Sequence, residues 1–158
     1  GHRAVDTVHR RQSAARRICA RRGMQLSVLH AEATEEGGWE ATARMLRRTP
    51  IPTACAVGSL NQLFGVMAAL RAAGLAVPAD MSVVSLDEDE CLAFLDVPVT
   101  SVAMPLAELG SAAVDALIAR VDQGAGLDQE PGGDVMIRGP MSLVLRQSVA
   151  GAPADRRR

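Results

Sequence analysis

Apolar and polar positions alternate along the chain in two rhythms, which predict helices and strands in turn. Apolar residues spaced three to four apart indicate one face of a helix, and short apolar runs between glycine or proline indicate buried strands. The helical spacing predicts helices at 11–22, 39–48, 61–73, 90–95 and 106–122. The apolar runs predict strands at 4–8, 26–30, 53–57, 82–86, 101–102, 135–137 and 142–145.

The order of these elements predicts the fold class. Strands that alternate with helices favour βαβ units with right-handed crossovers. We therefore predict an α/β fold whose parallel sheet has helices on both faces. Ligands of such sheets bind beyond the carboxyl ends of the strands. The first candidates for a site are therefore Gly58-Ser59 and Asp87, which follow two of the predicted strands.

Composition agrees with a packed α/β core. The chain has 158 residues, which is enough for one domain, and 48% of them are hydrophobic, which argues against disorder. It contains only two Phe, one Trp and no Tyr. Because the core must then be aliphatic, helices packed on a valine- and leucine-rich sheet are favoured over a β-sandwich.

Charge is unevenly distributed although the net charge is only −1. Residues 1–30 contain seven arginines and one acid, whereas residues 80–96 contain six acids and no base. An arginine cluster can contact phosphates, but no aromatic platform or reading helix accompanies this one. A solvated helix face is therefore the favoured interpretation.

No constellation of catalytic or metal-binding residues stands out. The cysteines, Cys19, Cys55 and Cys91, form no CxxC or Cys/His pattern, and the histidines lack ligand spacing. We predict no enzyme activity, no cofactor and no metal.

The chain has no signal sequence and no apolar run of about 18 residues, so we expect a cytoplasmic protein without membrane contact. It begins without Met, which is typical of a piece of a longer protein.

A series of short motifs runs in a fixed order through most of the chain. These motifs are Gly1-His2-Arg3, Pro52-Thr53-Ala54, Gly65, Ala69-Leu70, Gly74-Leu75, Val77-Pro78, Ser82-Val83-Val84, Asp87, Pro98, Thr100-Ser101-Val102, Pro105, Leu109-Gly110, Ala113, Leu117 and 143–148. No single motif is specific, but their order and spacing resemble the LacI/GalR family of bacterial transcription regulators.

The resemblance implies a periplasmic-binding-protein-like core of type I, in which two α/β subdomains close on a small-molecule effector. Members of the family are usually dimers, and an amino-terminal helix-turn-helix headpiece binds DNA. The chain resembles the carboxy-terminal half of that core. This implies the second subdomain at 1–100, a crossover helix and closing strands at 101–150, and a disordered arginine-rich tail at 151–158. DNA binding would then depend on a missing headpiece.

The resemblance also places Asp87 and Arg11 in the effector site. The carboxylate of Asp87 can accept hydrogen bonds from neighbouring sugar hydroxyls. As an alternative, it caps the next helix with Glu90 as its capping-box partner. Arg11 stands twelve residues before Gly23, where the family often has an effector-binding arginine with a fork of donors. Its alternative is one more solvated arginine.

Ser59 is a third candidate ligand-binding residue, at a position where the family usually has Asn. Leu60 then replaces the Asp that normally follows it, and Ala103-Met104 replace residues that are commonly polar. The favoured role for Ser59 is a turn or helix cap. These departures make the lining less polar, which indicates a less polar effector, decayed sensing or an incomplete gene product.

The predicted function is the effector-sensing and dimerising core of a LacI-type regulator, which binds a sugar or nucleoside. The resemblance implies that Leu63, Met67 and Leu95 lie at the interface of a homodimer. Two alternatives stay open. One is the solute-binding protein of a transporter, which would be secreted and monomeric. The other is a truncated remnant that dimerises but binds no effector.

Overall fold

The computed structural model describes residues 2–122, 137 and 139–152. The chain forms two compact units, Gly1–Ala31 and Glu32–Arg158. The predicted division is a different one, between a second subdomain at 1–100 and closing elements at 101–150 of a two-subdomain core. That division stays a prediction. The predicted tail lies almost entirely outside the described residues.

The first unit consists of helix α1 (His2–Arg21) and a segment after it without regular secondary structure. The helix ends at Gly23, whose φ of 63° is left-handed. There Met24 N donates to Cys19 O at 2.9 Å and Gly23 N donates to Ala20 O at 3.2 Å. These two bonds form the Schellman arrangement, which satisfies carbonyls that the helix end would leave unpaired.

Helix α1 confirms the predicted helix at 11–22 but overturns the predicted strand at 4–8, which belongs to the same helix. Neither glycine nor proline interrupts residues 2–22, so the helix can extend toward the amino end. The strand predicted at 26–30 is also wrong, because these residues belong to no strand or sheet. An apolar run becomes a strand only where another strand pairs with it.

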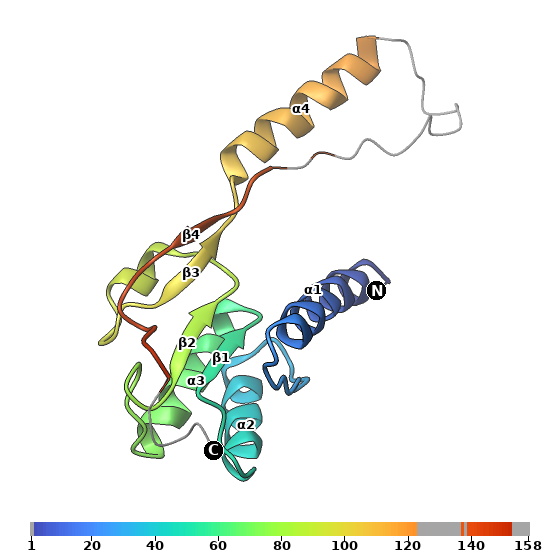
Figure 1. The fold of residues 1–158 in the computed structure, drawn as a ribbon. Helices are drawn as coiled ribbons and strands as arrows, with labels where there is room; N and C mark the ends of the chain where they lie inside the picture. Colours follow the sequence, from blue (N-terminus) through green and yellow to red (C-terminus); the bar gives the residue numbers. More distant parts are fainter. Residues whose placement is uncertain (1, 123–136, 138, 153–158) are drawn as a thin grey trace. The chain divides into compact units, whose positions relative to one another are not determined.

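The second unit contains a four-stranded sheet in the order β1-β2-β3-β4 (Figure 1). Its strands are β1 (Ala54–Val57), β2 (Ser82–Ser85), β3 (Thr100–Ala103) and β4 (Ser142–Val144). The first three run parallel, and β4 runs antiparallel to β3. The mostly parallel α/β fold is therefore confirmed. The strand predicted at 135–137 falls largely outside the described residues.

The helices of this unit follow the predicted order. They are α2 (Glu35–Leu46), α3 (Leu60–Ala72), the short 3-10 helix η1 (Glu90–Ala93) and α4 (Leu106–Asp122). Helix α2 begins at Glu35 rather than at residue 39, because Thr34 caps it by accepting a hydrogen bond from Gly37 N at 3.0 Å. The bounds of α3 and α4 agree with the prediction to within one residue.

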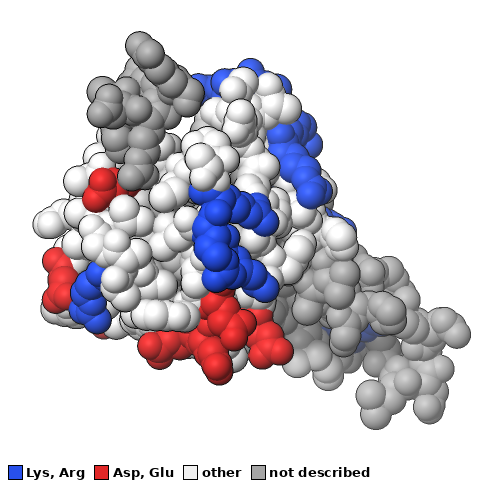
Figure 2. All heavy atoms as spheres, turned by 90° about the horizontal axis from the view of Figure 1, so that it is seen from below, with Lys and Arg blue, Asp and Glu red and all other residues white. Residues whose placement is uncertain are grey.

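Charges along α2 follow the helix dipole. Its first turn carries Glu35 and Glu36, and its last turn carries Arg44. Carboxylates stabilise the positive amino end of a helix, and cations stabilise the negative carboxyl end. In Figure 2, acidic and arginine side chains both appear in several groups on this face.

Helices α2 and α3 pack backbone against backbone at two buried glycines. A Cβ atom on Gly65 would overlap the carbonyl oxygen of Glu35 and would lie 2.6 Å from Trp39 N. A Cβ atom on Gly38 would overlap the carbonyl group of Gln62. Glycine at both positions lets the two helices approach more closely than any larger residue would allow.

The core is aliphatic, as the composition predicts. Its most enclosed apolar side chains are at most 1% exposed: Leu63, Leu70, Met81, Val83, Leu92 and Val99. They come from α3, the sheet and the segments between, so burial joins the helix to the strands. Each such side chain contributes about 1.5–3 kcal/mol when it leaves water.

Helix α4 has a different environment from α3. Apolar residues at helical spacing form one stripe of α4, but none of them is buried within this chain. Leu106 is 68% exposed and Val121 is 67% exposed. The apolar spacing predicts the helix correctly, but the described part of the chain does not cover its apolar face.

No described helix is long and apolar enough to cross a membrane.

The glycine contact predicts opposite effects for two Gly→Ala substitutions. Gly65→Ala forces α2 and α3 apart, and we expect it to lower the free energy of unfolding by about 1–3 kcal/mol. Gly110→Ala is the control, because a Cβ atom there meets no atom within 4 Å. In the middle of α4, alanine should stabilise by up to about 1 kcal/mol. Urea unfolding measures both, and equal effects would contradict the close contact.

Candidate functional site

Strands β1 and β2 end side by side at one edge of the sheet. Val57 pairs with Ser85 at the ends of the strands, and Leu86 N donates to Val57 O at 2.9 Å. Ser59 and Asp87 each follow two residues after this last pair. The parallel pairing therefore brings both predicted residues to the same edge, where ligands of parallel sheets bind.

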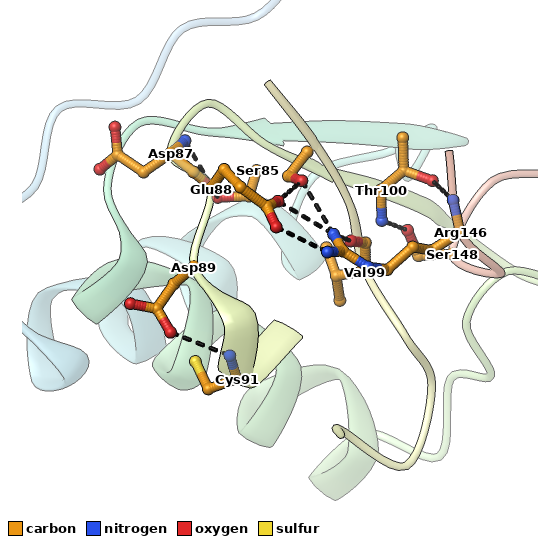
Figure 3. Close-up of polar contacts among 10 residues, drawn as sticks. Ser85, Asp87, Glu88, Asp89, Cys91, Val99, Thr100, Arg146 and Ser148 are labelled. Carbon is orange, nitrogen blue, oxygen red and sulfur yellow. Dashed lines mark hydrogen bonds and ion pairs between the residues drawn. The ribbon is translucent and has the colours of Figure 1, made fainter. Parts of the chain in front are cut away.

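The main chain of Asp87 is held on both sides by Ser85. The hydroxyl of Ser85 donates to Asp87 O at 2.6 Å, and Asp87 N donates to Ser85 Oγ at 3.2 Å. The half-buried carboxylate of Asp87 points away from the neighbouring Glu88 (Figure 3). The turn after β2 thus fixes the backbone and leaves the side chain directed elsewhere.

The capping role that was the alternative for Asp87 belongs to Asp89. Asp89 Oδ1 accepts a hydrogen bond from Cys91 N at 2.9 Å and caps η1 (Figure 3). That alternative for Asp87 is therefore wrong, because η1 begins two residues later than a cap at Asp87 requires.

Ser59 caps α3, as the favoured interpretation predicts. Its hydroxyl oxygen accepts a hydrogen bond from Gln62 N at 3.4 Å. Because capping uses an acceptor, the O–H group keeps its capacity to donate to another molecule. The neighbouring Leu60 is the first residue of α3 and is half-buried.

Arg11 is an exposed residue of α1, in the unit Gly1–Ala31. Its side chain therefore lies on a different unit from that of Ser59 and Asp87. A role for Arg11 in ligand binding stays a prediction.

A second polar group, which the sequence did not predict, lies next to this edge. Arg146 donates a fork of two hydrogen bonds to Glu88, from Nη1 to Oε2 at 3.0 Å and from Nη2 to Oε1 at 2.6 Å (Figure 3). Ser101 on β3 bonds to both residues. The side chains of Arg146 and Glu88 are only 14% and 23% exposed, so water screens the pair weakly.

The segment after β4 is inserted between β2 and β3. Ser148 Oγ accepts from Thr100 N at 2.8 Å and donates to Val83 O at 2.6 Å, and its side chain is fully buried. Val83 N in turn donates to Ser148 O at 2.9 Å. Ser148 thus joins the two strands at their beginnings and places Arg146 beside Glu88.

These contacts shift several pKa values. The hydrogen bonds from Arg146, and in smaller part that from Ser101, lower the pKa of Glu88, so its carboxylate stays ionised at neutral pH. The backbone N–H of Cys91 lowers the pKa of Asp89. Burial raises the pKa of the Cys55 thiol to about 11. The hydrogen bond with Asp89 raises the pKa of Cys91 as well, so neither thiol is an activated nucleophile.

The edge is suited to hydrogen bonding of a polar ligand. The carboxylate of Asp87 accepts hydrogen bonds, and the hydroxyl of Ser59 can donate one. Among the residues that the structure describes, no three His, Cys, Asp or Glu side chains are grouped closely enough to hold a metal ion.

The predicted interface residues differ in burial. Leu63 is fully buried within the chain, so its side chain stabilises the core and has no surface to offer to a partner. Met67 and Leu95 are half-buried and retain surface that a second molecule can contact.

Known proteins resemble the chain over almost its whole length. The family model of the periplasmic binding protein-like domain matches residues 1–149. The HTH-type transcriptional regulator reg1 of Streptomyces lividans is 34% identical over 154 residues, which cover 98% of this chain and 41% of that protein. The chain therefore spans about two fifths of the length of this relative.

Solved structures share the fold. A LacI family transcriptional regulator from Bifidobacterium animalis subsp. lactis superposes with a TM-score of 0.80 at 27% identity, covering 91% of this chain and 51% of that one. The Lac repressor dimer bound to operator and the anti-inducer ONPF superposes with a TM-score of 0.74 at 27% identity, covering 89% and 47%.

The Glu88–Arg146 pair predicts a pH-dependent contribution to stability. Because the pKa of Glu88 is lowered on folding, its contribution is present above the unfolded value near 4.5 and is lost as the pH falls through the folded value. We expect Glu88→Gln to lower the unfolding free energy by about 1–3 kcal/mol at neutral pH. The variant should also lose less stability than the parent on acidification.

Asp115→Asn on α4 is the matched control, because Asp115 is exposed and its change should cost less than about 0.5 kcal/mol. Urea unfolding at neutral and acid pH measures these differences. Parallel pH profiles for the parent and Glu88→Gln would show that the pair contributes nothing to the acid sensitivity.

Proposed function

Because the chain belongs to the periplasmic binding protein-like family, in the form carried by LacI-type transcription regulators, we propose that it is the effector-sensing part of such a regulator. It binds a small molecule of the sugar or nucleoside class at the edge that carries Ser59 and Asp87. A helix-turn-helix headpiece outside this chain binds the operator.

The position of Asp87 carries this proposal. Ser85 fixes its main chain, and Asp89 takes over the capping of η1. The carboxylate is therefore available at the carboxyl edge of a parallel sheet, where a ligand approaches. A carboxylate has acceptors only, so the ligand group that it recognises must donate hydrogen bonds, as neighbouring hydroxyls do.

The surroundings restrict the ligand further. Leu60, Ala103 and Met104 are apolar at positions where the resemblance implies polar residues. With few other polar side chains at this edge, recognition of the ligand's polar groups depends mainly on Asp87. A hydrogen bond to a charged group contributes about 1.5–3 kcal/mol, so removal of this carboxylate should weaken binding strongly.

We further propose that the regulator is a homodimer in which Met67 and Leu95 contact the other copy. The Lac repressor structure, which is similar to this chain, is a dimer bound to operator. In a dimer, an effector that binds one arrangement of the subdomains better than another shifts their equilibrium. That shift changes the spacing of the two headpieces and hence the affinity for operator.

Asp87→Ala should abolish stabilisation by effector while leaving the fold intact. A panel of sugars and nucleosides is screened by thermal unfolding, since a ligand at about 100 times its Kd stabilises by about 2.7 kcal/mol. Glu90→Ala is the control, because it removes an exposed acid three residues away. If a ligand stabilises Asp87→Ala as much as the parent, Asp87 is excluded as a contact. If no ligand of the panel stabilises the parent, the alternative of a truncated remnant without effector binding is favoured.

Leu95→Asp should weaken the dimer. A buried charge without a partner is unfavourable at an interface, so we expect the variant to sediment as a monomer at concentrations where the parent is a dimer. Leu145→Asp is the control, because Leu145 is an exposed leucine after β4. A dimer that persists unchanged in Leu95→Asp would exclude this surface.

A further inference from the structure

Glu88 directly follows Asp87 in the chain, and a segment far away in the sequence holds its carboxylate. Both carboxylate oxygens accept hydrogen bonds from the guanidinium of Arg146, at 3.0 and 2.6 Å, and Ser101 donates to Oε2 as well. A fork of two parallel bonds fixes the direction of its partners as well as their distance. The residue next to Asp87 is therefore held in place by its own side chain.

Arg146 is itself fixed by the strands around it. Its Nη1 also donates to Val99 O at 2.8 Å, and its backbone N–H donates to Thr100 Oγ1 at 3.0 Å. Ser148, two residues later, bonds to both β2 and β3. We call residues 145–150 the closing segment. Its seating between the strands determines where the guanidinium lies, and hence where Glu88 lies (Figure 3).

The main chain around Asp87 is thus held on both sides. Ser85 bonds to Asp87 N and to Asp87 O, and the fork from Arg146 holds the following residue. The carboxylate of Asp87 points away from Glu88 (Figure 3). Because Asp87 and Glu88 share one planar peptide unit, a rotation of the backbone at Glu88 would turn the Asp87 carboxylate as well.

Stability alone is a weak reason for a largely buried ion pair at this place. Removing two charges from water is costly, and replacing a buried pair by apolar residues is often neutral or stabilising. The fork does provide a defined direction. A group that binds a ligand has to be held to within about 0.5 Å and 10–20° of its working geometry, and a fixed neighbour supplies that precision.

We propose that Glu88 and Arg146 are positioning residues of the ligand site, through which the closing segment sets the direction of the Asp87 carboxylate. Neither residue needs to touch the ligand. Affinity then depends on whether the closing segment is seated, although Arg146 lies 58 residues beyond Glu88 in the sequence. This inference rests on the proposed role of Asp87 in ligand binding.

The first test needs no ligand. Arg146→Lys replaces the fork by a point charge, and Glu88→Gln removes the anion. In both variants the backbone N–H of Asp87 should exchange with solvent about tenfold faster, as the local loss of a charged hydrogen bond predicts. Met45→Ala is the matched control, because it truncates a buried side chain on α2, which packs on α3.

Amide exchange followed by NMR, with urea unfolding as the measure of global stability, separates the local effect from the global one. Met45→Ala should speed exchange of the Asp87 amide only as far as it lowers the stability of the whole unit. If exchange in Glu88→Gln and Arg146→Lys also follows global stability alone, the fork does not position Asp87 and the proposal is overturned.

The second test measures affinity. Ribose and adenosine are the probes, because they share the pentose ring common to a sugar and a nucleoside. Calorimetric titration should give a Kd about tenfold higher in either variant, as loss of a residue that orients a ligating side chain does at metal sites. The double variant should bind no more weakly than each single one, because both changes break one interaction. Met45→Ala should keep the Kd of the parent.

The outcomes separate this inference from the function on which it rests. A parent that binds a probe with the same Kd as both variants overturns the positioning role and leaves the ligand site intact. Additive losses in the double variant would reveal two independent contributions and overturn it too. A parent that binds neither probe counts against the proposed ligand class, and the positioning role is then decided by the exchange rate of the Asp87 amide.

Discussion

The buried hydroxyl of Ser148 holds the sheet together where β2 and β3 begin. Direct pairing of these strands begins only at Val84 and Thr100. At this start, Ser148 Oγ bonds both Val83 O and Thr100 N. A buried backbone group without a partner would cost about 1–3 kcal/mol. The same insertion places Arg146 beside Glu88.

Features that depend on local chemistry were predictable from the sequence. Helix α3 begins after a capping serine, Ser59, and ends before Gly74, whose φ of 71° suits only glycine. Its bounds follow from these signals and from apolar spacing. The strand predicted at 4–8 failed because strand formation requires a pairing partner, and no local pattern tells whether one exists. The apolar face of α4 was predictable, whereas what covers it was not.

The site was predictable where topology alone decides it. The rule for parallel sheets leads to Asp87 and Ser59 without knowledge of any side-chain contact. Glu88 was not found because it stands in a run of four acids, and its partner Arg146 lies 58 residues away. Only burial distinguishes the paired acid from its solvated neighbours. Similarly, helical spacing predicts the apolar face of α3, but only packing shows that Leu63 is fully buried and Met67 half-buried.

The closing segment has a consequence for synthesis on the ribosome. Ser82, Val83 and Glu88 are translated 58–68 residues before Ala150, Ser148 and Arg146, which bind them. At about 5–20 residues per second, the partners follow roughly 3–14 seconds later. During this interval the outer edge of β3 is an unpaired strand edge, which is a template for pairing with other chains. The nascent protein therefore needs most protection from aggregation just before β4 emerges.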